Sequence, residues 1–181
     1  VVLSDNGGTA NGGDDTADTV TFTITVTAVN DVPSFTAGAN VTVDEDAGAQ
    51  TVTNWANAIS KGPANESSQT LTFTVSNNNN SLFSTQPSID PITGTLTFTP
   101  AANANGSATV TVVLSDNGGT ANGGDDTADT VTITIIVTAV DDNPIVAGIA
   151  DQTNIRGDSV SVATTASDVD GDVLTYTATG L

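Results

Sequence analysis

The sequence predicts an all-β chain made of tandem Greek-key β-sandwich modules with about seven strands each. The first observation behind this prediction is a long internal repeat, because residues 1–33 return almost unchanged as residues 112–144, an offset of 111 residues. The second is the dominance of apolar–polar alternation with a period of two, which is typical of strands with one buried face. The third is that turn-forming residues separate the alternating segments, and no segment has helical periodicity.

The repeat also predicts the domain organisation. A period of 111 residues is the length of an ordinary domain rather than of a solenoid unit. We expect the last strands of one repeat at 1–32, a complete repeat at 33–143 and the first part of a further repeat at 144–181. With no initiator Met and no apolar run near the roughly 18 residues of a membrane span, we expect a slice of a longer protein. The two copies differ at four positions. In chain order, the first copy has Phe22, Thr25, Asn30 and Val32 where the second copy has Ile133, Ile136, Asp141 and Asn143.

Four segments of the complete repeat and its closing hairpin alternate most clearly. They cover residues 70–76, 95–100, 107–115 and 130–140, and we expect shorter strands at 41–43, 50–55 and 81–83. Threonine fills most outward positions, since its branched side chain favours strands while its hydroxyl stays in water. The inward positions expected for the last two long segments are Ala108, Val110, Val112, Leu114, Val131, Ile133, Ile135 and Val137.

Turn signals separate these strands at Gly62-Pro63, at the Asn run 77–80, at Pro91 and at 100–106. Seven short strands in about 110 residues is the pattern of an immunoglobulin-like sandwich. Trp55 and the Phe residues supply bulk to a core of otherwise small apolar side chains. Because the chain has no Cys, no disulfide reinforces it. We therefore expect modest stability that other cross-links would improve.

The charge balance selects the class of partner. The chain has 21 acids and only two bases, Lys61 and Arg156, so its formal charge is -19. Nucleic acids and anionic membranes need basic patches, which excludes both as partners and points to cations. The absence of His and Cys, with so few bases, leaves no acyl-transfer or phosphoryl-transfer constellation to assemble. We do not expect an enzyme.

The acids gather in the linkers and just after them. The last strand of each copy runs into Val-Asn-Asp-Val-Pro (29–33) or Val-Asp-Asp-Asn-Pro (140–144). Residues 44–46 are Asp-Glu-Asp, and residues 168–172 are Asp-Val-Asp-Gly-Asp, with carboxylates at alternate positions and a glycine for a sharp turn. Dense hard oxygen ligands favour Ca²⁺, which binds six to eight of them. A solvated polar turn is the alternative reading of these clusters.

These motifs resemble a known family. Pro-Ser-Phe at 33–35 followed by Val-Asp-Glu-Asp-Ala-Gly at 43–48 looks like the opening of a cadherin repeat. The two linkers resemble the cadherin inter-domain linker, and Leu-Ser-Asp at 114–116 resembles the Ala-x-Asp near its last hairpin. The whole unit is similar to the tandem cadherin-like or Ig-like repeats of giant bacterial surface proteins. The tail at 150–176 is similar to a related Ig-type repeat of such proteins, so the resemblance covers nearly the entire chain.

The resemblance implies Ca²⁺ at each junction, with ligands from the base of one module, the linker and the top of the next. Where cadherins carry Asp-x-Asp, residues 65–68 are Asn-Glu-Ser-Ser with a single acid. This departure predicts a first junction that is weaker or empty. The ligands implied for the first junction are Asn30, Asp31, Glu66 and Asp116, and those for the second are Glu45, Asp141, Asp142, Asn143, Asp168, Asp170 and Asp172.

The Gly- and Asp-rich loop 5–18, repeated at 116–129, is similar to the calcium-binding nonapeptides of secreted toxins but lacks their regular period. We expect a long, mobile hairpin loop.

These features together favour a structural stalk or extender module of a long secreted or cell-surface bacterial adhesin or fibre. Its expected partners are neighbouring repeats of the same chain, without nucleic acid and without membrane insertion by these residues. The alternatives are an adhesion module that binds glycan, ice or protein, and a subunit of an extracellular filament formed with like chains.

Overall fold

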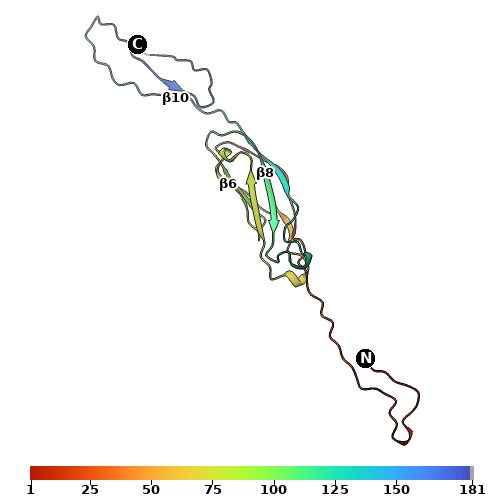
Figure 1. Ribbon diagram of the computed structural model, residues 1–181. Helices are drawn as coiled ribbons and strands as arrows, with labels where there is room; N and C mark the ends of the chain where they lie inside the picture. Colours follow the sequence, from red (N-terminus) through yellow and green to blue (C-terminus); the bar gives the residue numbers. More distant parts are fainter. Residues whose placement is uncertain (180–181) are drawn as a thin grey trace.

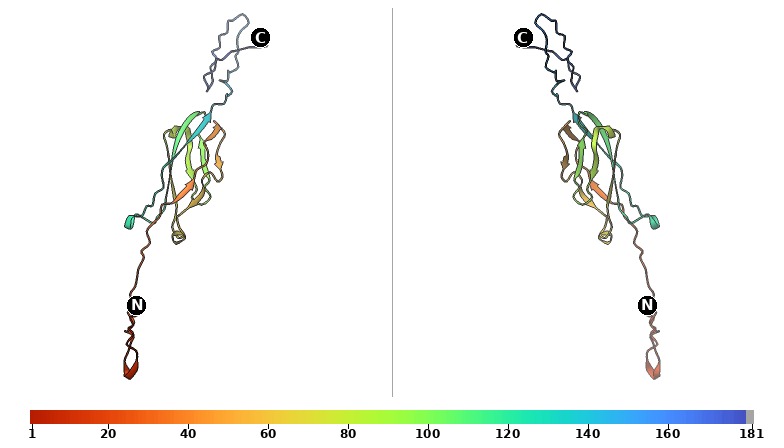
Figure 2. Two further views of the ribbon diagram at one scale, coloured as in Figure 1. Left: turned by 90° about the vertical axis from the view of Figure 1, so that its right-hand side faces the viewer. Right: turned by 90° about the vertical axis from the view of Figure 1, so that its left-hand side faces the viewer.

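The computed structural model describes residues 1–179 as an elongated molecule (Figure 1). A central β-sandwich lies between two slender segments, which carry the chain termini at opposite ends of the molecule (Figure 2). The predicted all-β class is confirmed. The helices of the described residues are single 3-10 turns of three residues each, η1 (Ala10–Gly12), η2 (Ala64–Glu66), η3 (Asn80–Leu82) and η4 (Ala121–Gly123).

Two sheets face each other in the central module. One has the strand order β2-β9-β8-β5, the other has the order β3-β7-β6, and β1 pairs with β4 beside them. The pairing of β2 with β9 is parallel, whereas the other pairings are antiparallel. The strands are β1 (Ser34–Thr36), β2 (Val41–Asp44), β3 (Gln50–Val52), β4 (Asn57–Ser60), β5 (Thr72–Asn77), β6 (Phe83–Ile89), β7 (Leu96–Pro100), β8 (Gly106–Ser115) and β9 (Val131–Thr138).

The number of strand segments differs from the expected seven, because the central module has nine. The strand expected at 50–55 ends at Val52 and the chain resumes pairing only in β4. Asn54, between β3 and β4, has φ of 54°, and Ala58, inside β4, has φ of 51°. This left-handed conformation interrupts an extended strand. The segment expected at 81–83 is largely the turn η3, and the strand that follows it is β6. The Greek-key connectivity stays a prediction.

The core consists of the alternate side chains that the sequence pattern places inward. Ala108, Val110, Val112 and Leu114 are at most 1% exposed, which confirms the inward face expected for β8. The predicted inward residues of β9 are buried too, except for Val131, which is half-buried. From the opposite sheet, Leu96, Phe98 and Phe83 join this core, together with Trp55 from the loop between β3 and β4.

The two copies of the repeated hairpin have opposite environments. Ile135 in β9 is fully buried, whereas Ile24, its counterpart in the first copy, is 77% exposed. Phe22 and Val26 are exposed in the same way. The first copy keeps a single bridge, Ser4 to Thr16, which corresponds to the Ser115–Thr127 bridge of the second. Identical alternation therefore produces a buried strand only where other strands cover it.

The C-terminal segment is simple in the described residues. β10 (Ile145–Val146) pairs antiparallel with β11 (Ala166–Ser167), and the chain around them is extended or turning. That residues 1–32 and 144–181 belong to further modules stays a prediction. No helix within residues 1–179 combines the length and apolar character needed to cross a membrane.

Candidate cation-binding junctions

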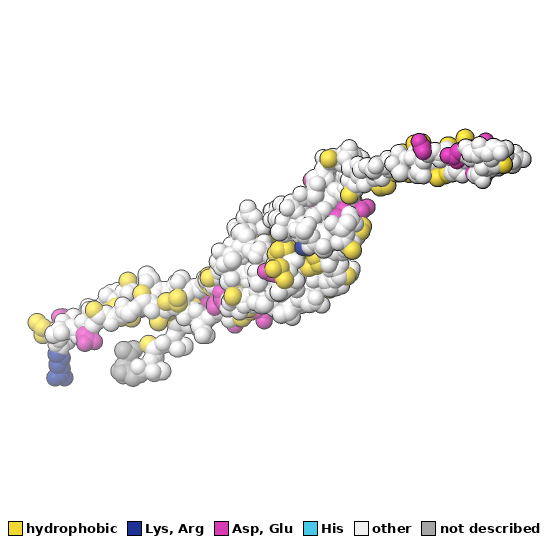
Figure 3. Space-filling view, turned by 90° about the horizontal axis from the view of Figure 1, so that it is seen from below, with side chains coloured by type: hydrophobic (Ala, Val, Ile, Leu, Met, Phe, Trp, Pro, Cys, Tyr) yellow, Lys and Arg dark blue, Asp and Glu magenta, His cyan; other side chains and the backbone are white. Residues whose placement is uncertain are grey.

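Acidic side chains gather where the central body meets each slender segment (Figure 3). We call the contacts around Asn30 and Asp31 the first junction, and those around Asp141 and Asp142 the second junction. The linkers occupy equivalent positions in the repeat, 111 residues apart. The two junctions are therefore built on the same position of the repeat but have different neighbouring residues.

The first junction brings together the four residues that the resemblance implied. The Asn30 side chain donates to Asp116 Oδ1 at 3.0 Å, and the backbone N–H of Asp31 donates to Glu66 Oε1 at 2.8 Å. Gln69, which the sequence did not single out, donates from Nε2 to Asn30 Oδ1 at 2.6 Å. No signal in the sequence distinguishes this neutral amide from the other polar residues of its loop.

Glu66 is held in the junction by the local backbone. It ends the turn η2, where its N–H donates to the carbonyl of Pro63 at 2.9 Å. Gly62 has φ of +115°, and a Cβ at this position would overlap Glu66 Oε2. Only glycine gives the carboxylate this space, and Glu66 is 4% exposed.

Three buried oxygens of this junction have no hydrogen-bond partner in the described structure: Glu66 Oε2, Gln69 Oε1 and Asp116 Oδ2. A cavity of about 190 Å³ adjoins Glu66 and Gln69, and Asn30, Asn65 and Gly118 also line it. An unpartnered buried oxygen is costly, so a water or a cation is the expected occupant of such a place. The first junction thus has the donor chemistry for an ion, although the sequence predicted it to be weaker.

The Gly- and Asp-rich loop 116–129, for which the sequence predicts a long, mobile hairpin loop, is hydrogen-bonded to the linker. Asp125 donates its N–H to the carbonyl of Asn30 at 3.2 Å and accepts from the Asn30 side chain at 2.8 Å. The first copy of the loop has nearly the same backbone, since Asn11 and Asn122 both have φ of 56°. The loop therefore has the same conformation in both copies, and the second copy adds the contacts to Asn30.

The second junction begins at the base of the central module with Glu45, which is 3% exposed. Its Oε1 accepts the N–H of Val140 at 2.9 Å. Across the linker, the N–H of Asp142 donates to Asp170 Oδ2 at 2.7 Å. Asp168 then orders the turn, because its Oδ1 accepts the N–H of Asp170 at 3.0 Å and that of Asp172 at 3.2 Å.

The electrostatics of the second junction reflect crowded carboxylates. Burial, followed by the charges of Asp46, Asp170, Glu45 and Asp168, raises the pKa of Asp142 above its ordinary value of 3.8. Asp142 Oδ2 is also buried without a hydrogen-bond partner in the described structure. Asp46 was not among the predicted ligands, although it belongs to the acidic run 44–46.

Asp172 belongs to the same cluster. The charges of Asp168 and Asp141 are the main reasons why its pKa is raised, with smaller contributions from burial and from a hydrogen bond to Asp141. Asp168, Asp170 and Asp172 therefore interact with the linker acids, as the ligand prediction requires. Mutual repulsion of this kind is relieved by a cation or by protonation.

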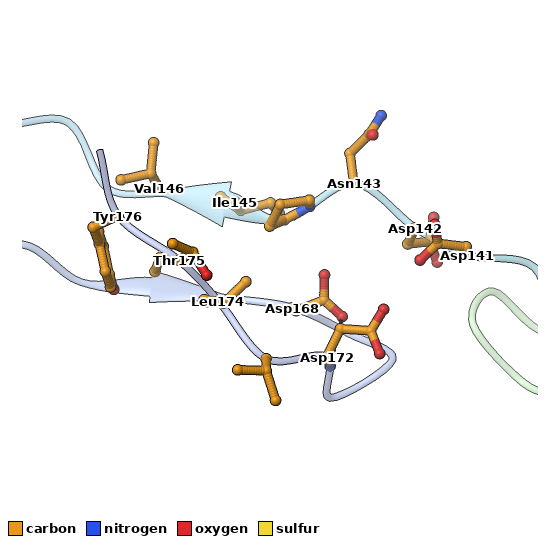
Figure 4. A pocket seen from close by; sticks show the side chains of 13 residues that line it. Asp141, Asp142, Asn143, Ile145, Val146, Asp168, Asp172, Leu174, Thr175 and Tyr176 are labelled. Atoms are coloured by element: carbon orange, nitrogen blue, oxygen red, sulfur yellow. Dashed lines mark hydrogen bonds between the residues drawn. The ribbon is translucent and has the colours of Figure 1, made fainter. Parts of the chain in front are cut away.

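A cavity of about 430 Å³ adjoins this cluster. Figure 4 shows Asp141, Asp142, Asp168 and Asp172 near one end of it, with Ile145, Leu174 and Tyr176 farther along. Asn143 lines the same cavity, but its side chain points away from the carboxylates of Asp168 and Asp172 in this view. Asn143 is therefore the predicted ligand that the geometry supports least.

The carboxylates are neighbours but are not arranged as a finished site. Among residues 1–179, no group of three or more acidic side chains has the geometry to hold a metal ion. Side-chain rotations would be needed to converge on one ion. No protein-family model matches the chain, and a search of curated proteins found no significant similarity.

Proposed function

We propose that this chain is a structural module of a long extracellular bacterial protein, a stalk or fibre whose inter-module junctions are stiffened by Ca²⁺. The observation that carries the proposal is the second junction, where acids from the central module, the linker and the following segment crowd around Asp142 and raise its pKa. These three sources are separate in the sequence. A cation bound among them would join the two parts of the chain.

Calcium suits this arrangement better than a smaller ion. It accepts six to eight oxygens at about 2.3–2.6 Å with flexible geometry, whereas Mg²⁺ demands a near-ideal octahedron and keeps its waters. A cluster whose carboxylates must rotate to converge therefore favours Ca²⁺. Without the ion, carboxylate repulsion would loosen the junction.

The central module has the dimensions of a strut. β8 has ten residues, which at about 3.3 Å per residue span roughly 33 Å along the long axis of the molecule. The linkers leave the sandwich at opposite ends (Figure 2). Repeating such a unit extends a fibre, provided that the junctions resist bending.

Calorimetric titration of the full chain with Ca²⁺ tests the proposal. We expect binding in the wild type, and we expect Asp142→Asn to weaken it at least about 10-fold, since charge count sets calcium affinity. Asp151→Asn, a change in an exposed acid outside the second junction, is the matched control and should leave the affinity unchanged. Absence of binding, or equal loss in both variants, would contradict the proposal.

A second candidate function, self-assembly into a filament, is favoured by the first copy of the hairpin. Its apolar face at Val20, Phe22, Ile24 and Val26 is 65% to 89% exposed, whereas the equivalent face of β9 is buried or half-buried. A second copy of the chain could cover it. Sedimentation at increasing protein concentration tests this, because a passive strut stays monomeric.

A further inference from the structure

Asn30 uses all the polar groups of its side chain in the first junction. Its amide nitrogen donates to Asp116 Oδ1 at 3.0 Å and to the carbonyl of Asp125 at 2.8 Å. Its amide oxygen accepts from Gln69 Nε2 at 2.6 Å, and its backbone carbonyl accepts from the N–H of Asp125 at 3.2 Å. One linker residue thus ties together two loops of the module that follows it.

Two glycines, Gly118 and Gly124, lie so close to Asn30 that neither position has room for a side chain. A Cβ on Gly118 would overlap the Asn30 side chain, and a Cβ on Gly124 would lie 3.0 Å from Asn30 Cβ. In the first copy of the loop, the equivalent Gly7 has only Asp5 within 4 Å of such a Cβ. A glycine at position 118 is therefore needed for the linker contact, whereas a Cβ at the equivalent position 7 would meet no linker residue.

The repeat places Asp141 where the first junction has Asn30. A carboxylate has no N–H to donate, so Asp141 cannot form the bonds that the Asn30 amide donates. Asp141 instead lies against Asp172, another carboxylate. The two junctions share the next contact along the chain. The following linker residue donates its N–H to an acid in both, from Asp31 to Glu66 and from Asp142 to Asp170.

We propose that residue 30, or 141, of the repeat decides the cation requirement of a junction. Asn30 closes the first junction as a hydrogen-bonded clamp that keeps its geometry without a cation, whereas Asp141 makes the second junction depend on one. The second half of this inference rests on the proposed function, and the first half does not. A cation bound near Glu66 would then add to the first junction without being needed to hold it together.

Amide hydrogen exchange on the full chain, measured in EDTA and in Ca²⁺, tests both halves. We expect the N–H groups of Asp31 and Asp125 to be protected in EDTA and to change less than about 3-fold with Ca²⁺. Exchange of these two groups at the unprotected rate in EDTA would overturn the clamp. The N–H of Asp142 should gain protection in Ca²⁺, and a lack of change there would overturn the proposed function while leaving the clamp intact.

Variants locate the effect in residue 30. Asn30→Asp should reduce the protection of the Asp125 N–H about 10-fold or more in EDTA, because bonds to Asp116 and to the Asp125 carbonyl are lost and two carboxylates then face each other. Ca²⁺ should restore part of it. Protection equal to the wild type in EDTA would overturn the proposal. Unchanged exchange in β8 shows that the sandwich is still folded.

Two further comparisons keep the test independent of Asn30→Asp. Gly118→Ala should also expose the Asp125 N–H, whereas Gly7→Ala, the same change in the free copy of the loop, should not. Equal effects of the two would contradict the clamp. Asp141→Asn should shrink the Ca²⁺-dependent change at Asp142, and an undiminished change would contradict the role of residue 141.

Discussion

Replacing Ile135 by alanine tests whether the central module contains the buried copy of the repeated hairpin. Ile135 is fully buried in β9, between Ala108 of β8 and Val41 of β2. Removing its side chain down to Cβ costs about 2–5 kcal/mol of unfolding free energy, through lost burial and the cavity left behind. The same change at Ile24, which is 77% exposed, should cost less than about 0.5 kcal/mol. The two residues occupy equivalent positions of the repeat, and their flanking sequences differ between residues 20–26 and 131–137 only at Phe22/Ile133 and Thr25/Ile136.

Urea unfolding followed by the fluorescence of Trp55 is the assay. Trp55 is the only Trp of the chain and is 3% exposed in the central module, so its signal follows this module alone. With a urea slope of about 1–3 kcal/mol per M, Ile135→Ala should lower the midpoint by roughly 0.7–5 M. If this variant does not fold, Ile135→Val should still cost about 0.5–1.5 kcal/mol. Equal shifts for Ile24→Ala and Ile135→Ala would refute the assignment.

Two further predictions concern the second junction. The pKa of Asp142 and that of Asp172 are raised above 3.8, so docking of the linker at the second junction takes up protons. In EDTA, this docking should therefore strengthen as the pH falls from neutral toward 3.8. It should weaken as the pH rises through the raised pKa values. Exchange of the Asp142 N–H, corrected for its intrinsic pH dependence, measures this, and a flat profile would contradict it. Glu45→Ala leaves the N–H of Val140 without its acceptor, so it should destabilise the central module by about 1–3 kcal/mol in EDTA. Unchanged urea unfolding of Trp55 fluorescence would show that Glu45 has no structural part.

The long strands were predictable because their alternation is strong and uninterrupted. The inward faces of β8 and β9 follow directly from the period of two. β1 and β4 were missed because each is only three or four residues long, and the break between β3 and β4 has a left-handed Asn54 without a Gly or Pro to signal it. The exposure of Ile24 could not be predicted either, because its burial depends on strands that lie outside the local sequence.

The candidate sites were predictable where acids carry the signal. Asn30, Asp31, Glu66 and Asp116 meet at the first junction as the resemblance implied. Gln69 was missed because a neutral amide in a polar loop has no distinguishing pattern. The docked loop 116–129 was missed because its Gly-rich sequence indicates freedom, and only the geometry shows that the glycines make room for Asn30.

A distance measurement across the second junction tests the central claim most directly. The chain has no Cys, so spin labels can be attached at Thr85→Cys in the central module and Thr164→Cys in the C-terminal segment, both at exposed positions. Labels at Thr74→Cys and Thr85→Cys, within one module, are the control. We predict that Ca²⁺ narrows the distribution of 85–164 distances and that EDTA broadens it, while the 74–85 distribution stays constant. An 85–164 distribution that is the same with and without Ca²⁺ would contradict a cation-stiffened junction.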